Sequence, residues 1–188
     1  MSSRADAMSS VRPRGPRGGV FFLGAAVFML LVSLAGFGKT FFLPLATGSV
    51  VFDPVTLLHG GFFFAWMLWF LSQSVLVRTG RRDWHRRLGW ASIPLAVGMV
   101  VSCLAVGAIR ARAELAGGPQ GGHVDGFAGV FMAMLVFSLL YVAALQARRN
   151  PEAHKRLMLL ATVAVLWPAW FRFRHYFPDV PRPEILFG

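Results

Sequence analysis

Charged residues and cysteine are scarce in this sequence. Only 14% of the 188 residues are charged, whereas a soluble domain carries about 25%. The single cysteine, Cys103, lies in an apolar run and cannot form an internal disulfide. The Gly-x-Ser-x-Gly and His-Glu-x-x-His motifs are both missing, which argues against serine-hydrolase and zinc-protease chemistry.

Apolar residues dominate what remains. They make up 56% of the chain, and the mean hydropathy is +0.59. The net charge of +11 might suggest nucleic acid as a partner. However, the basic residues fall between long apolar runs, which is the layout of membrane loops rather than of a nucleic-acid-binding face. The composition therefore indicates an integral membrane protein whose constant partners are membrane lipids.

Five apolar runs are long enough to cross a bilayer as helices, which predicts an all-α membrane bundle. The expected spans are 20–38, 55–77, 84–109, 123–145 and 151–171. They form one membrane domain over residues 20–177, between a basic, disordered N-terminal tail (1–19) and a C-terminal tail (178–188). Asn150 followed by Pro151 predicts a capped helix start, and Pro168 is expected to kink the last span.

The basic loops also predict an orientation. With a cytoplasmic N-terminus, the two arginine-rich loops that follow the second and fourth spans lie inside. The positive-inside rule favours this arrangement. We therefore expect a bacterial inner-membrane protein with its N-terminus in the cytoplasm and its C-terminus in the periplasm.

Four histidines mark a repeat in the chain. The phrase His85-Arg-Arg-Leu returns as His154-Lys-Arg-Leu, each with an acidic residue two positions earlier. More weakly, His59-Gly-Gly-Phe resembles His123-Val-Asp-Gly-Phe. The second to fifth spans are therefore predicted to form a four-helix core with a two-fold repeat. In the expected orientation, His59 and His123 lie near the outer face, and His85 and His154 lie near the inner face.

The pattern suits haem chemistry. Two neutral imidazoles from facing helices are natural axial ligands for haem iron. Glycines near the histidines, such as Gly60, Gly61 and Gly89, offer room for a flat ring. Cationic side chains that would bind haem propionates flank the inner pair: Arg86, Arg87, Lys155 and Arg156. The sequence therefore predicts two haem b groups, one held by His59 and His123, the other by His85 and His154.

In its architecture the chain resembles the cytochrome b561 group. The resemblance rests on His59, His85, His123 and His154, one from each of four core helices and paired first with third and second with fourth. It implies transmembrane electron transfer, with quinone or another respiratory-chain component as partner. The His-Arg-Arg-Leu-Gly phrase also resembles small bacterial multi-span membrane proteins of unassigned function, some linked to oxidase biogenesis.

Two other interpretations remain open. Asp53, Asp125, His59, His123 and His175 are expected near the outer face and would suit copper, zinc or iron, as in a metallochaperone or an oxidase-assembly factor. Alternatively, the chain is an accessory subunit of a larger membrane complex, or a homodimer, and its inner histidines are interfacial residues that contact lipid headgroups. Asp83 and Glu152 would then be helix caps and salt-bridge partners.

Overall fold

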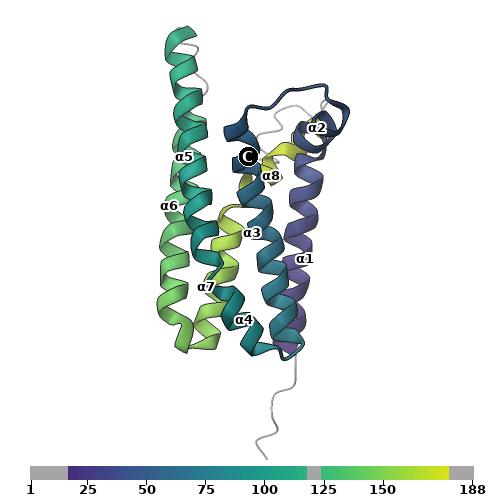
Figure 1. Ribbon diagram of the computed structural model, residues 1–188, viewed down its shortest axis with the longest axis vertical. Coiled ribbons are helices and arrows are strands. Elements are labelled where there is room, and N and C mark those ends of the chain that lie inside the picture. Colours follow the sequence, from purple (N-terminus) through teal and green to yellow (C-terminus); the bar gives the residue numbers. More distant parts are fainter. Residues whose placement is uncertain (1–16, 118–123, 178–188) are drawn as a thin grey trace, which may run out of the picture.

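The computed structural model describes residues 17–117 and 124–177, and every regular element in these ranges is a helix (Figure 1). The long helices are α1 (Arg17–Phe37), α3 (Pro54–Arg78), α5 (Ser92–Gly117), α6 (Val124–Gln146) and α7 (Pro151–Ala164). The short ones are α2 (Leu43–Thr47), α4 (Arg82–Gly89) and α8 (Trp167–Phe171), with single 3-10 turns at Ala147–Arg149 and Arg172–Tyr176. Five helical segments are long and apolar enough to cross a membrane, which confirms the predicted fold class.

The long helices run side by side, and each packs on its neighbours in a ring (Figure 1). α3 packs on α1 and α5, α5 on α6, α6 on α7, and α8 returns to α1. The first span therefore belongs to the bundle, and it contributes Ala26 and Met29 to the common core.

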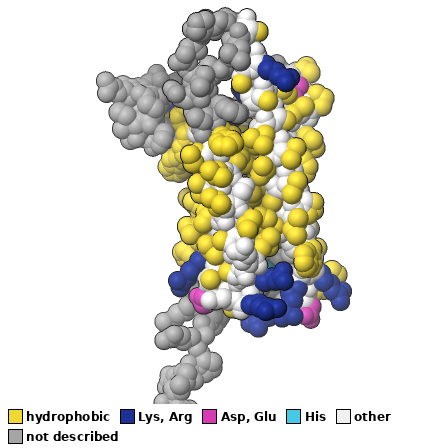
Figure 2. All heavy atoms as spheres, turned by 90° about the vertical axis from the view of Figure 1, so that its left-hand side faces the viewer, with side chains coloured by type: hydrophobic (Ala, Val, Ile, Leu, Met, Phe, Trp, Pro, Cys, Tyr) yellow, Lys and Arg dark blue, Asp and Glu magenta, His cyan; other side chains and the backbone are white. Residues whose placement is uncertain are grey.

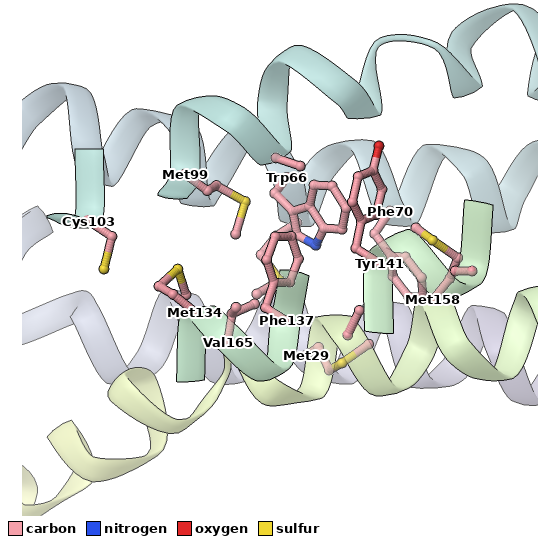
Figure 3. Close-up of a cluster of buried hydrophobic side chains, with 14 of the residues drawn as sticks. Met29, Trp66, Phe70, Met99, Cys103, Met134, Phe137, Tyr141, Met158 and Val165 are labelled. Carbon is pink, nitrogen blue, oxygen red and sulfur yellow. The ribbon is translucent and has the colours of Figure 1, made fainter. Parts of the chain in front are cut away.

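Trp66 of α3 lies at the centre of that core and is fully buried (Figure 3). Its ring makes edge contacts with Phe137 and Tyr141 of α6. Its indole N–H donates to the hydroxyl of Thr162 on α7, at 3.3 Å. One aromatic side chain thus joins three helices, and its polar atom is satisfied inside the bundle, as an apolar environment requires.

Helix starts follow the capping rules. The side chain of Asn150 accepts a hydrogen bond from the backbone N–H of Ala153, and Pro151 occupies the first turn of α7. This confirms the predicted helix start. Asp53 caps α3 in the same way, with Pro54 at its first position.

Proline interrupts two of the predicted spans. The third span, expected as one helix over 84–109, is instead split into α4 and α5 around Trp90. Pro94 has no N–H to donate to the Trp90 carbonyl, which accepts from Ile93 at 3.2 Å instead. In the last span, α7 ends at Ala164. Pro168 has no N–H to donate to the carbonyl of Ala164, in agreement with the expected kink.

The first span is longer than expected. Instead of ending near residue 38, the helix continues through a π-helical segment, Gly38–Phe42, into α2. It ends at Gly48, whose φ of +64° lies in the left-handed region that glycine tolerates best.

Figure 2 shows a belt of hydrophobic side chains along the molecule, with most of the visible Lys and Arg side chains gathered at one end. The exposed residues Arg78, Arg81, Arg82, Arg148 and Arg149 define this basic end. α1 and α7 begin here, and α3 and α6 end here (Figure 1). The pattern is that of a membrane protein with one strongly basic surface.

We predict that Gly36→Ala destabilises the bundle by about 1–3 kcal/mol, the usual cost of overpacking. A Cβ at Gly36 would overlap the backbone carbonyl of Ala169, where α1 meets α8. Gly24→Ala is the matched control, because the same change on α1 meets no atom within 4 Å. Unfolding in detergent should separate the two variants, and equal stability would contradict the close packing of α1 on α8.

Candidate functional site

The helix α4 carries His85 into the bundle. Over its length only His85 and Gly89 are partly buried, and the other residues are exposed. These two residues are four apart and therefore share one face of the helix. α4 packs on α3, and the indole N–H of Trp69 donates to the carbonyl of Leu88 at 2.9 Å. This bond holds α4 with its histidine face turned inward.

His154 lies in the second turn of α7, at the same end of the bundle. Its Nδ1 atom is 2.8 Å from the backbone carbonyl oxygen of Ala144 on α6. Because a carbonyl oxygen only accepts hydrogen bonds, the proton of the neutral ring must be on Nδ1. The Nε2 atom then keeps its lone pair, the state in which imidazole binds a metal.

The structure brings these two histidines together. Their ring centres are 6.4 Å apart, and the ring planes are nearly perpendicular, at 78°. When a metal ion binds two imidazoles on opposite sides, each bond is about 2.0 Å long and each ring centre lies about 1.1 Å behind its bound nitrogen atom. The two ring centres are then about 6.2 Å apart. The spacing of the pair therefore suits one metal ion between the rings.

Buried polar atoms without partners occur in His85 and Gln73, and also in Thr40 at the opposite end of the bundle. The Nδ1 atom of His85 is buried and has no hydrogen-bond partner among the described residues. The same is true of both amide atoms of Gln73, whose side chain is buried seven residues after Trp66 on α3. Native proteins pair most buried polar atoms, so these atoms point to a polar or metal-containing ligand. From the sequence, Gln73 was expected to bond a neighbouring helix and was not predicted as a site residue, but neither of its amide atoms has a partner among the described residues.

The four predicted cations differ in their surroundings. Lys155 and Arg156 pair with Glu152, at 2.5 and 3.6 Å. Arg86 and Arg87 are exposed and have no acidic partner among the described residues, although the Arg87 guanidinium lies 5.9 Å from the Trp84 ring. Arg86 and Arg87 are therefore the more available cations for an anionic group beside the histidine pair.

The predicted outer pair, His59 and His123, cannot be compared in the same way as the inner pair. His59 is half-buried near the start of α3, with its Nδ1 3.4 Å from the hydroxyl of Ser102 on α5. His123 lies outside the described residues, so its pairing with His59 stays a prediction. The expected gap at Gly60 is filled, because a Cβ there would be 3.1 Å from the Phe41 ring.

No three of the described histidine, cysteine, aspartate and glutamate residues come together as a metal site. Asp53 uses both carboxylate oxygens to cap α3, accepting from the backbone N–H and the hydroxyl of Thr56 at 2.9 and 2.6 Å. His175 lies in the 3-10 turn after α8, where its carbonyl is 3.4 Å from the Lys39 ammonium. The side chain of Asp125 is outside the described part of the chain.

Open space beside the histidine pair is found at Gly89, on α4. The centre of the bundle is filled by the aromatic core around Trp66. A small cavity of about 20 Å³ lies beside Phe37, Phe63 and Met67 and touches no histidine. At Gly89, by contrast, a Cβ would meet no atom within 4 Å. The open side of the site therefore lies along α4.

No known protein family matches this chain, and no significant match occurs among curated proteins or solved structures.

We predict that Asp53 serves as a helix cap and not as a metal ligand. Its hydrogen bonds from Thr56 lower the pKa of the carboxyl group. The Asp53 carboxylate therefore stabilises the folded protein fully above its unfolded-state pKa of about 3.9. This stabilisation disappears as the pH falls through the lower pKa of the folded state. Asp53→Ala should lower the melting temperature at neutral pH, and its difference from wild type should shrink in acid.

Asp53→Ser is the matched control, because serine also caps helices. It should melt close to wild type, and neither substitution should change the content of bound copper, zinc or iron. A loss of metal in both variants would show that the carboxylate is a ligand.

Proposed function

We propose that this chain is a b-type membrane cytochrome in which His85 and His154 bind haem iron at the basic end. The observation that carries the proposal is the approach of the two imidazoles, with ring centres 6.4 Å apart. Neutral imidazole pairs from separate helices are established axial ligands of haem. Haem would supply one-electron redox chemistry there, and His85 and His154 as its two protein ligands would favour electron transfer.

The surroundings of His154 support a ligand role. Metal-binding histidines almost always donate their second ring N–H to a carbonyl, a carboxylate or water. The Nδ1 atom of His154 has such a partner in the carbonyl of Ala144, which is buried. This bond sets the tautomer and the direction of the ring before any ligand binds, so the ring loses little freedom on ligation.

The surroundings of His85 supply space and charge. Gly89 leaves the adjacent turn of α4 open to a planar ring. Arg86 and Arg87 are next to His85 in the chain and are not paired with described acidic residues. Guanidinium groups bind carboxylates with two parallel hydrogen bonds, which suits the propionates of a haem whose edge faces the membrane surface.

Electron transfer across the membrane needs a second redox centre near the opposite end. We assign this role to His59 together with His123, as the repeat of the sequence suggests. In this proposal the basic end faces the cytoplasm, in accordance with the positive-inside rule. Electrons would pass between the two haems and a partner such as quinone at one surface.

The first test is a reduced-minus-oxidised absorbance spectrum of detergent-purified protein from haem-replete cells. Wild type should hold about two haems per chain, and His85→Ala or His154→Ala should reduce this to about one, because bis-histidine ligation needs both rings. His175→Ala, a histidine at the opposite end, should retain both. A spectrum without haem bands in wild type, or unchanged haem content in both pair variants, would exclude the proposal.

Loss of folding must be separated from loss of ligation. For this purpose His85→Gly leaves a space in which free imidazole can act as the ligand. Added imidazole should restore the missing bands in His85→Gly and should have no effect on wild type. Failure of this rescue in a variant that elutes and melts like wild type would contradict a direct role of the ring.

A second prediction concerns the outer centre. His59→Ala should remove one haem and spare the one at the basic end, because the two pairs share no ligand. Redox titration of the variant should then show a single midpoint instead of two. Loss of neither haem would exclude His59 as a ligand and leave the assignment of His85 and His154 unaffected.

A further inference from the structure

A shallow groove of about 390 Å³ lies on the outside of the bundle at its basic end. It is lined by the last residues of α6, Val142, Leu145 and Gln146, and by Arg148 and Arg149 of the 3-10 turn that follows. One edge of the groove is therefore cationic, and Val142 and Leu145 give it an apolar part. It is separate from the interior side of α6, where the carbonyl of Ala144 meets His154.

The two arginines of the groove are unpaired. Both are exposed, and neither makes a salt bridge with any described residue. The nearest acidic residue along the chain is Glu152, which is already engaged by Lys155 and Arg156. Two uncompensated guanidinium groups thus lie at the boundary between the apolar belt and the basic surface, where lipid phosphates are found.

The apolar side of the groove continues along α6. Met132, Leu135, Leu139 and Val142 are spaced by three, four and three residues, so they lie along one face of the helix. All four are exposed, between 43% and 63%. With a rise of about 1.5 Å per residue, this stripe is about 15 Å long and leads directly away from the arginines.

We propose that this surface is a binding site for an anionic phospholipid. The phosphate would bind Arg148 and Arg149, and an acyl chain would lie along the stripe from Val142 towards Met132. Arginine binds phosphate with paired hydrogen bonds, which a diffuse basic surface does not provide. A zwitterionic phospholipid offers the same phosphate, but its ammonium group would be repelled by the two arginines. The site therefore selects a lipid with net negative charge, such as phosphatidylglycerol.

The chain contains a matched control for charge alone. Arg81 and Arg82 are also adjacent, exposed and at the basic end, but they lie at the start of α4 and do not line the groove. Neutralising either pair removes the same charge from the same surface. Only neutralising Arg148 and Arg149 removes the phosphate ligands of the proposed site.

The test is native mass spectrometry of the full chain released from bilayer discs with equal amounts of phosphatidylglycerol and phosphatidylcholine. Wild type should retain one phosphatidylglycerol in preference. Arg148→Gln with Arg149→Gln should weaken this retention by roughly tenfold or more, because it removes both charge-assisted contacts to the phosphate. Arg81→Gln with Arg82→Gln should stay within about twofold of wild type. Equal losses in the two double variants would mean a diffuse surface effect and would overturn the site.

A third variant tests the apolar part. Val142→Trp fills the groove but keeps both arginines, and this lipid-facing position tolerates a large apolar side chain. It should reduce retention of phosphatidylglycerol as strongly as the loss of the arginines. If Val142→Trp retains the lipid normally, or if inorganic phosphate alone displaces it, the ligand is a simple anion and the lipid assignment fails. Circular dichroism and gel filtration confirm that each variant is folded.

Discussion

The arrangement of the basic end depends on one interruption of the helical backbone, at Trp90. Pro94 cannot donate to the carbonyl of this residue, so the third span cannot continue as one helix. In an apolar environment each carbonyl freed by such a break needs another donor. The Trp90 carbonyl accepts from Ile93, the Gly89 carbonyl from the hydroxyl of Ser92, and the Leu88 carbonyl from Ala91 and Trp69.

These replacement bonds set the direction of α4. One of them comes from another helix, since Trp69 belongs to α3, and it ties the end of α4 to its neighbour. The hydroxyl of Ser92 also meets that of Tyr141 at 2.8 Å, which links the start of α5 to α6. A break that only removed hydrogen bonds would leave α4 free to swing. Because the freed carbonyls find partners within the bundle, His85 is held facing α7.

The position of His154 along the bundle is set by the contacts of α7. Thr162, which accepts the indole N–H of Trp66, follows His154 by eight residues on α7, or about 12 Å along the helix axis. The bond between Trp66 and Thr162 aligns α7 with α3, and the Asn150 cap sets where α7 begins. Hydrogen bonds in the core thus place one imidazole, and those around the break place the other.

Much of this fold follows from hydropathy and capping. Long apolar runs predict the spans, and Asn150 with Pro151 predicts the start of α7. The repeated phrase at His85 and His154 also predicts that these residues are equivalent, and the structure places their rings together. The separate helix α4 was missed, although Pro94 was the available signal, because sequence periodicity does not show how a broken helix is compensated. Gln73 and the groove on α6 depend on burial and exposure, which only packing determines.

The last turn of α6 serves both faces of the protein for one physical reason. The final four carbonyls of an α-helix have no partner within the helix, and its C-terminal end carries partial negative charge. The carbonyl of Ala144 is among these four, so it is free to accept the N–H of His154. Arg148 and Arg149 follow the same end, where a cation is favoured. A helix ending at this point therefore orients an imidazole on its inner side and presents two cations to the membrane on its outer side.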